Sequence, residues 1–443
     1  MLLSFRVTNH KSLRHEQQLN LTPAFEADRP AGTKWRAVPV TAIYGANASG
    51  KSNLIDALSF ARAMALSSDR RGEPGHGVDR SPFALSPQAA REESWYVVDA
   101  VIDSVRHTYG FGLNDDEVVE EWLHRYPKGR RQIVFERKAG AYRFGTTVDD
   151  NLRRMTDITP ARVLFLSSSA RFEQPDVLPM YCWLLDVRIS NLPRSGSERI
   201  SPLVRLLSDE THRQQVLGLL RHADLGIADV RVERVERVET DESAPREPDR
   251  RNIDAWIRQV GGAELNSTKP DPGFSVPTFR IEIRFTMVGA EPGTTLGLNQ
   301  QSAGTRTLLE HLPDVLACLD SGGVFMVDEL ESSLHPVLAR HVVRLFQDPR
   351  TNPRGAQLIF ATHDTSLLGS NNEWLKRDQV WFIEKDHETG CSSLYPLTDF
   401  KPRTRESTER RYLGGGYGAI PFIDDDAPAE LPGPADGAES DDA

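Results

Sequence analysis

The chain has little cysteine, no long apolar run and no internal repeat, and each absence narrows what it can be. Only three cysteines occur in 443 residues, scattered at Cys182, Cys318 and Cys391, which excludes a disulfide framework and a cysteine-based metal site. No stretch approaches the roughly 20 apolar residues that span a bilayer, and the first residues lack a signal-peptide layout. We therefore expect a cytoplasmic protein with no membrane partner.

Repetition is also missing from the sequence. No heptad pattern is sustained through the middle of the chain, which excludes a long coiled-coil arm. No period of 20 to 50 residues recurs either, which excludes a solenoid. The chain is long enough for two or three domains, or for one large domain with insertions.

The negative charge of the chain is concentrated at its C-terminal end. The formal net charge is -11 at pH 7, and the residues from Asp424 onward carry eight acids and no base. Removing those eight charges from -11 leaves -3 for the remainder. The nearly neutral body does not exclude a nucleic-acid partner. The tail over 424–443 is rich in Pro, Ala, Gly and Asp, and is expected to be disordered.

The strongest motif is G-x-x-x-x-G-K-S over residues 45–52, between an apolar run from Val40 and a helix-like segment over 53–65. A strand, a Gly-rich turn and a helix are the context that a phosphate-binding loop requires. The N–H groups of the loop would converge on the β-phosphate. Lys51 would reach the β- and γ-phosphates and the Ser52 hydroxyl would ligate Mg²⁺. The predicted nucleotide contacts are Asn47, Ala48, Ser49, Gly50, Lys51, Ser52 and Asn53, and the predicted ligand is ATP with Mg²⁺.

A second group of motifs follows more than 240 residues later. Residues 301–305 open a helix-like segment that runs to about residue 319, and an apolar strand over 323–329 then ends in two acids. The strand over 357–361 is followed by His363. Each feature alone has a structural explanation, such as solvated charges at a strand end. In this order after a phosphate-binding loop, they predict an ATP-binding-cassette ATPase.

The chemistry of these residues suggests their roles. Asp328 would position Mg²⁺ through water. Glu329 would be the general base that activates the attacking water, and His363 would contact the γ-phosphate or hold that water. Ser302 and Gly304 stand at a helix start, where exposed N–H groups suit a phosphate.

Alternation and composition predict the remaining elements. We expect an antiparallel sheet over 94–146, because apolar and polar residues alternate there. The other expectations are two strands within 1–22, a mobile loop over 67–86, a buried strand over 162–167, helices over 173–190 and 199–222, an exposed strand and a loop over 230–252, and a strand over 278–285.

The chain resembles bacterial abortive-infection ATPases of the SMC/ABC type, the group of RloA and of the PARIS defence ATPase. The matching segments lie at 1–12, 45–52, 165–167, 302–305, 327–336, 360–364, 378–385 and 412–421. The resemblance implies an α/β fold, an ABC/SMC-type P-loop ATPase head with an antiparallel β subdomain and a mostly helical insertion. The implied domains are the N-terminal half over 1–170, the insertion over 171–290, the C-terminal half over 291–423 and the tail over 424–443.

The resemblance also assigns roles to residues for which local chemistry indicates none. It puts Lys11 beside the phosphates, although taken alone Lys11 is a solvated turn lysine. It implies an ATP-bridged homodimer in which the signature at Ser302 reaches the nucleotide of the other subunit, with Ser333 and His335 at the interface. Arg171 stands at the place of the glutamine that senses Mg²⁺ in the family, and the nearest glutamine is Gln174. Either Gln174 takes that place at the metal from a shifted loop or an arginine has replaced the glutamine, so hydrolysis is expected to be slow.

Family members are commonly encoded beside an effector of Toprim-like or RloB-type nuclease fold. The resemblance therefore implies an ATP-driven sensor or scaffold of anti-phage defence that controls a separate effector and that a nucleic acid or phage component could trigger. A RecF-like DNA-repair ATPase remains an alternative; its basic surface would be Lys401, Arg403, Arg405, Arg410 and Arg411, diluted by Glu406 and Glu409. A transporter subunit fits poorly, because the signature lies far from the phosphate-binding loop. The glycine-rich stretch over 412–421 is expected to be a turn that closes the fold.

Overall fold

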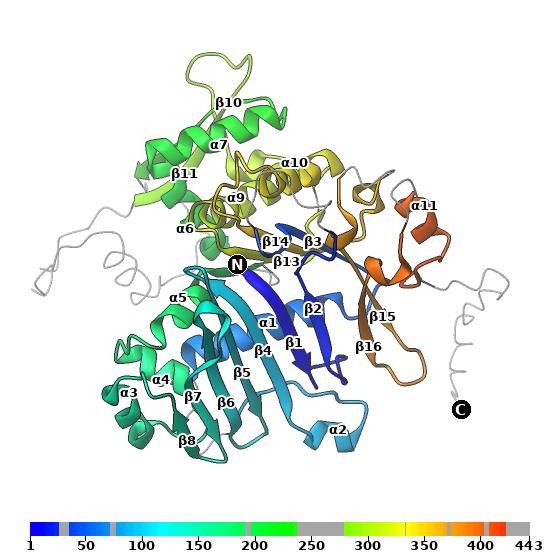
Figure 1. Cartoon of the computed structure of the whole chain (residues 1–443). Helices are drawn as coiled ribbons and strands as arrows, with labels where there is room; N and C mark the ends of the chain where they lie inside the picture. Colours follow the sequence, from blue (N-terminus) through cyan, green and yellow to red (C-terminus); the bar gives the residue numbers. More distant parts are fainter. Residues whose placement is uncertain are drawn as a thin grey trace, which may run out of the picture. The chain divides into compact units, whose positions relative to one another are not determined.

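A computed structural model describes residues 1–25, 35–70, 77–190, 196–236, 279–332, 334–369, 374–402 and 407–421. The chain divides into two compact units (Figure 1). The first combines Met1–Pro193 with Pro313–Ala443, and the second is Arg194–Leu312. Both ends of the chain therefore build the first unit, and the middle of the chain forms the second.

A six-stranded sheet in the first unit brings distant strands together. Its order is β16-β15-β3-β14-β13-β9, and all its neighbours are parallel except the pair of β15 and β16. The strands are β3 (Val40–Tyr44), β9 (Val187–Ser190), β13 (Val324–Val327), β14 (Gln357–Ala361), β15 (Val380–Lys385) and β16 (Ser392–Pro396). Because β3, β13 and β14 are parallel neighbours, the loops that follow them meet at one edge of the sheet.

The first unit also contains a seven-stranded antiparallel sheet of order β2-β1-β4-β5-β6-β7-β8. Its strands are β1 (Leu2–Thr8), β2 (Gln17–Asn20), β4 (Ser94–Ile102), β5 (Val105–Leu113), β6 (Val118–Tyr126), β7 (Gln132–Lys138) and β8 (Ala141–Phe144). The predictions of an antiparallel sheet over 94–146 and of two N-terminal strands are confirmed.

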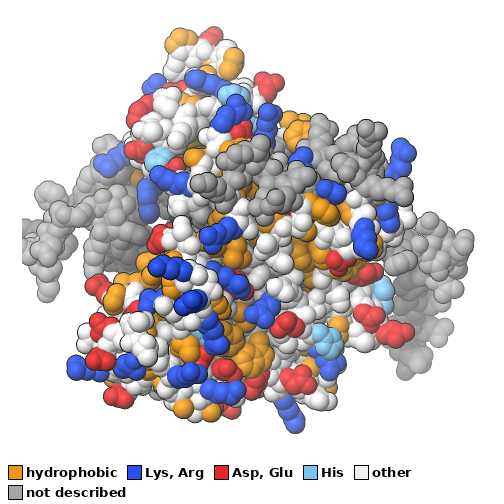
Figure 2. Space-filling view, in the orientation of Figure 1, with side chains coloured by type: hydrophobic (Ala, Val, Ile, Leu, Met, Phe, Trp, Pro, Cys, Tyr) orange, Lys and Arg blue, Asp and Glu red, His pale blue; other side chains and the backbone are white. Residues whose placement is uncertain are grey.

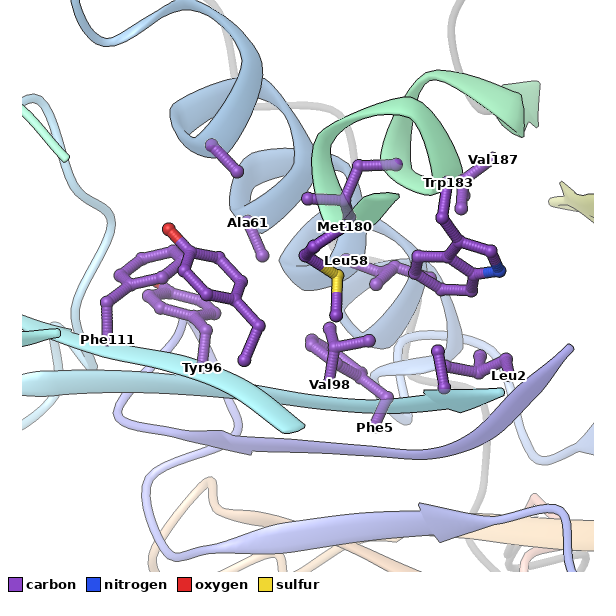
Figure 3. Close-up of a cluster of buried hydrophobic side chains, with 14 of the residues drawn as sticks. Leu2, Phe5, Leu58, Ala61, Tyr96, Val98, Phe111, Met180, Trp183 and Val187 are labelled. Atoms are coloured by element: carbon purple, nitrogen blue, oxygen red, sulfur yellow. The ribbon is translucent and has the colours of Figure 1, made fainter. Parts of the chain in front are cut away.

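Helix α1 (Lys51–Ser67) contributes to a core that both sheets share. Leu58 packs in one buried cluster with Phe5 of β1 and Val98 of β4, and Ile359 of β14 belongs to the same cluster. Figure 3 shows Leu58 and Phe5 together with Met180 of the neighbouring helix α5 (Leu178–Asp186). The loop that precedes α1 is thus anchored by a helix with buried residues on several faces.

Two local predictions on the way to this core are wrong. The run over 162–167 is not a strand, because its second half begins helix α4 (Phe165–Arg171). The buried carboxylate of Glu121 accepts hydrogen bonds from the backbone N–H groups of Phe165 (2.6 Å) and Leu166 (3.0 Å), which satisfies the first turn of the helix. The helix predicted over 173–190 ends earlier, because Val187–Ser190 pairs with β13 as β9.

The second unit consists of α6 (Gly196–Ser208), α7 (Glu210–His222), the strands β10 (Ile227–Glu236), β11 (Phe279–Met287) and β12 (Leu296–Gly297), and the start of α9 (Ala303–Ser321). Both helices pack on β10. The helices predicted over 199–222 and the strands predicted near 230 and over 278–285 are confirmed; residues 237–252 lie outside the described part of the chain. The remaining helices of the first unit are α2 (Pro87–Arg91), α3 (Asp150–Arg154), α10 (Pro336–Gln347) and α11 (Thr408–Leu413).

The boundaries of the second unit differ from those of the predicted insertion over 171–290. Helix α5 packs on α1, and β9 extends the parallel sheet, so residues up to Pro193 belong to the first unit. At the other end, β12 pairs with β11, which keeps the segment up to Leu312 in the second unit. The boundaries follow these long-range pairings rather than local composition.

The loop predicted to be mobile over 67–86 is packed where it is described. Arg80 is 8% exposed; it pairs with Asp115 at 2.7 Å and donates to the Ser94 hydroxyl at 3.1 Å. The backbone N–H of Phe83 donates to the side chain of Asn9 at 2.9 Å. Residues 71–76 lie outside the described ranges, as do Ser333, Arg403, Arg405, Glu406 and the tail over 424–443.

Charges on the antiparallel sheet are largely paired. Arg106 contacts Asp99 at 2.9 Å, and Lys138 contacts Glu120 at 3.3 Å. Figure 2 shows basic and acidic side chains interspersed over the lower part of the molecule, where this sheet lies. Within the described ranges, no helix is both long enough and apolar enough to cross a bilayer.

Candidate nucleotide-binding site

The loop over 45–50 connects β3 to α1 and excludes side chains at two positions. A Cβ on Gly45 would lie 2.4 Å from the carbonyl oxygen of Ile383, and a Cβ on Gly50 would lie 2.5 Å from Ser392 Oγ. Gly50 has φ +113°, a conformation that only glycine adopts without strain. Ala48 also has a positive φ of 62°. The loop is therefore a tight cradle formed by backbone.

Side chains from both ends of the chain hold this loop in place. Ser392 Oγ lies 2.6 Å from the carbonyl oxygen of Ser49 and 2.7 Å from Ser12 Oγ. The side-chain amide of Asn53 donates to Ser12 Oγ at 2.6 Å. The amide of Asn53, a predicted nucleotide contact, thus supports the loop in this structure. Sequence reasoning missed Ser12 and Ser392, whose partners are far away along the chain.

Lys51 lies over its own loop. Its Nζ donates to the carbonyl oxygens of Gly45 at 2.8 Å and Ala46 at 3.0 Å, and the residue is 6% exposed. Burial lowers the pKa of Lys51, while the negative charges of Asp328, Glu329 and Glu331 raise it. Those three carboxylates therefore lie within electrostatic range of the ammonium group. Among its neighbours, Asn47, Ala48 and Ser52 are exposed, whereas Ser49 and Gly50 are buried.

The two acids after β13 differ in their surroundings. The backbone N–H of Asp328 donates to the carbonyl oxygen of Ser190 at 3.1 Å, and its Oδ1 is buried with no hydrogen-bond partner among the described residues. Glu329 is exposed and has a positive φ of 53°. An unsatisfied carboxylate oxygen and the exposed Ser52 hydroxyl are hard oxygen donors of the kind Mg²⁺ prefers. The residues present therefore fit a magnesium ion bound with a phosphate.

His363 follows β14, next to the loop after β13. Its backbone N–H donates to Glu331 Oε1 at 2.5 Å. Burial lowers the pKa of His363, the positive charge of Lys51 lowers it further, and the carboxylates of Glu331, Glu329 and Asp328 raise it. His363, Lys51 and the acids of the β13 loop are thus brought together at one sheet edge. Glu331 was missed by sequence reasoning, although an acid two residues after Glu329 was a visible signal.

Two predicted contacts are engaged elsewhere in the structure. Lys11 Nζ pairs with Asp56 Oδ2 of α1 at 2.7 Å. Gln174 donates from its amide to the carbonyl oxygen of Phe172 at 2.8 Å, and Arg171 pairs with Asp69. These contacts fix the start of the chain and the α4 segment.

The signature residues belong to the second unit. Ser302 Oγ accepts a hydrogen bond from the backbone N–H of Thr305 at 3.1 Å, so Ser302 caps α9, and Gly304 lies in its first turn. Ser302 is exposed. In the first unit, His335 caps α10: its Nδ1 accepts from the backbone N–H of Val337 at 3.3 Å. Both caps keep the first helical turn regular.

A phosphate-binding loop between a parallel sheet and α1, two acids after β13 and a histidine after β14 define a P-loop ATPase of the ABC/SMC type. The chain belongs to the family described as "AAA domain, putative AbiEii toxin, Type IV TA system", whose model matches residues 40–369. The matched range begins at β3 and includes His363. The predicted α/β fold of an ABC/SMC-type ATPase head is confirmed by this topology and family.

Several solved structures are distant likenesses. The SMC head domain from Thermotoga maritima is 14% identical, with a TM-score of 0.39, and the match covers 89% of this chain and 98% of that chain. The SmcHead bound to the C-winged helix domain of ScpA is 13% identical, with a TM-score of 0.42 and coverages of 90% and 99%. The recombination mediator protein RecF with ATP is 14% identical, with a TM-score of 0.34 and coverages of 89% and 97%. No curated protein matches the sequence significantly.

Proposed function

We propose that this protein binds ATP with Mg²⁺ and hydrolyses it slowly, as the sensor or scaffold ATPase of an anti-phage defence system. One observation carries the proposal: Lys51, the acids from Asp328 to Glu331 and His363 converge where the phosphate-binding loop opens. That edge of a parallel sheet is where α/β proteins bind their ligands. The family membership over 40–369 supports the ATPase class.

Each residue has a task that its surroundings suit. Lys51 exchanges the carbonyl oxygens of Gly45 and Ala46 for phosphate oxygens, and Ser52 and Asp328 hold Mg²⁺. The ion neutralises negative charge on the phosphates when it is bound. Glu329 is exposed, so its carboxylate is free to take a proton from the attacking water. His363 stays neutral at physiological pH, because its pKa is lowered, and holds the water or the γ-phosphate.

The active form in this proposal is a homodimer that two ATP molecules bridge. Ser302 and Gly304 of a second copy complete each site, because the exposed first turn of α9 offers N–H groups to the γ-phosphate. His335 lies at the same interface, where the resemblance places it. Binding of the nucleotide then links two subunits, and hydrolysis separates them.

The biological role follows from the resemblance to abortive-infection ATPases. The ATP-bridged dimer holds a separate effector of the Toprim or RloB nuclease type and releases it when a nucleic acid or phage component arrives. The family description, which names a toxin system, is compatible with a defence role. It does not identify the effector.

The proposal is tested by native mass spectrometry of Glu329→Gln protein isolated from cells that also hold the neighbouring genes. With ATP and Mg²⁺ we expect a dimer that carries a second, smaller protein, and Lys51→Ala should give a monomer. A dimer that carries DNA and no protein would replace the defence role with a DNA-clamp role. If the mass of the particle is the same with and without ATP, and no ATP turnover depends on Lys51, the ATPase function itself is wrong.

A further inference from the structure

The loop that carries His363 contacts a C-terminal segment for which the ATPase mechanism gives no role. We call residues 363–366 the switch loop and residues 407–421 the C-terminal segment. The C-terminal segment contains α11 and a glycine-rich turn. Its sequence suggested only a turn that closes the fold.

Three hydrogen bonds join the switch loop to other parts of the chain. Glu331 accepts from the backbone N–H of His363 at 2.5 Å. The Tyr44 hydroxyl donates to the carbonyl oxygen of Asp364 at 3.1 Å. The Thr365 hydroxyl donates to Glu409 Oε1 at 3.2 Å. Tyr44 is the last residue of β3, directly before the phosphate-binding loop, and Glu409 lies in the first turn of α11.

Aromatic packing joins Tyr44 to α11, the helix that carries Glu409. The rings of Tyr44 and Tyr412 meet edge to face at 5.7 Å, and Tyr412 stacks on Phe382 at 5.4 Å. Tyr417 stacks on the same Phe382 ring at 5.4 Å. Tyr44 is fully buried and Tyr412 is 6% exposed. The cluster therefore binds α11 to the strand that leads into the phosphate-binding loop.

The glycine-rich turn supports this packing. The Tyr412 hydroxyl donates to the carbonyl oxygen of Ala419 at 3.1 Å, and the Tyr395 hydroxyl donates to that of Tyr417 at 2.9 Å. Gly418 has φ +70°, and a Cβ there would lie 2.8 Å from the Tyr395 hydroxyl. Only glycine fits at this position, so the turn returns the chain onto α11.

The Tyr44 hydroxyl stays protonated and can keep its hydrogen bond to the switch loop. Burial, followed by the negative charges of Asp364 and Glu331, raises the pKa of Tyr44 well above its usual value, so its phenol remains a donor. Oδ2 of Asp364 and Oγ of Ser366 are buried and have no hydrogen-bond partner among the described residues. Within the loop, Asp364 Oδ1 accepts from the backbone N–H of Ser366 at 2.9 Å, so the external anchors add to this internal cap.

We propose that Glu409, acting through Thr365, is a positioning residue that holds the switch loop so that His363 faces the γ-phosphate. Tyr44 acts in the same way through the Asp364 carbonyl. This inference rests on the proposed ATPase function. It gives the C-terminal segment a role in the rate of turnover.

The test compares substitutions that remove or keep this hydrogen bond. Thr365→Val removes the donor and keeps the side-chain shape, Glu409→Ala removes the acceptor, and Glu409→Gln keeps an acceptor oxygen. We expect Thr365→Val and Glu409→Ala to lower kcat by about fivefold, the effect of one ordinary hydrogen bond, with unchanged affinity for ATP. Glu409→Gln should retain most of the activity. Glu388→Gln, at an exposed turn, is the matched control for the charge change.

A second measurement does not need nucleotide. Hydrogen exchange of backbone amides over 361–369 should be faster in Thr365→Val and Glu409→Ala than in the wild type, and unchanged in Glu388→Gln. If turnover depends on Lys51 while Thr365→Val matches the wild type in kcat and in exchange, the positioning role is wrong and the ATPase function stands. If the wild type shows no Lys51-dependent turnover, the ATPase function is wrong and the catalytic part of this inference fails with it. If Thr365→Val lowers the unfolding midpoint and the affinity for ATP as well as kcat, the hydrogen bond is purely structural and the positioning role is wrong.

Discussion

Substitution of Gly50 by alanine tests the idea that the phosphate-binding loop requires glycine at this position. Gly50 has φ +113°, where an L-residue pays a strain of about 1–3 kcal/mol. The new Cβ would lie 2.5 Å from Ser392 Oγ and 2.9 Å from Ser12 Oγ. To relieve the collision, Ser392 must leave the Ser49 carbonyl oxygen, which it contacts at 2.6 Å, at a further cost of about 1 kcal/mol.

The two costs add to about 2–4 kcal/mol. The sheet and α1 are fixed by a large core, so we expect the substitution to change the conformation of the loop and to leave the fold intact. The affinity for ATP should then fall by about 30- to 700-fold, since each 1.4 kcal/mol is a factor of ten. The unfolding midpoint should change much less than the binding energy.

Calorimetric titration with a non-hydrolysable ATP analogue measures this loss. Gly140→Ala is the matched control, because Gly140 has φ +78° and nothing within 4 Å of an added Cβ. It carries backbone strain without a collision and lies in the β7–β8 turn, so its affinity for ATP should equal that of the wild type. Wild-type affinity in Gly50→Ala would refute the reasoning, as would an equal loss in Gly140→Ala.

Three further predictions concern stability and assembly. Glu121→Gln should destabilise the fold by about 1–3 kcal/mol in chemical denaturation, because an amide N–H₂ would then face a backbone N–H such as that of Leu166. Burial lowers the pKa of His107 below its usual 6.5. The contribution of neutral His107 to the stability of the fold is therefore complete above pH 6.5 and is lost as the pH falls below 6.5. Melting curves should show a lower midpoint at about pH 5.5 than at about pH 7.5, and His107→Gln should make that difference smaller. Ser302→Arg in a Glu329→Gln background should keep ATP affinity and abolish the ATP-dependent dimer in light scattering; a dimer that persists would contradict a role for the signature across the interface.

Local signals were enough to predict much of the fold and part of the candidate site. The spacing of Gly45, Gly50 and Lys51 depends on a turn of a few residues, whose backbone requirements are written in consecutive positions. Alternation over 94–146 predicted the antiparallel sheet, because its strands are neighbours in sequence and one face is buried. The acids after β13 and the histidine after β14 were recognisable because each directly follows an apolar strand.

Other features depend on partners that a local window does not contain. The apolar run before Ser167 suits a strand or a helix equally well, and the carboxylate of Glu121 selects the helix by accepting its first N–H groups. Likewise, Val187–Ser190 is a strand because β13 offers it a free edge.

The sequence by itself therefore predicted which polar residues gather at the sheet edge, since each lies beside the element that presents it. The tertiary structure decided what holds those residues in place. Ser392 reaches Ser12, Glu331 reaches His363 and Glu409 reaches Thr365 across long stretches of chain. Such contacts leave no period or spacing in the sequence, because only the tertiary fold brings the partners within hydrogen-bond distance.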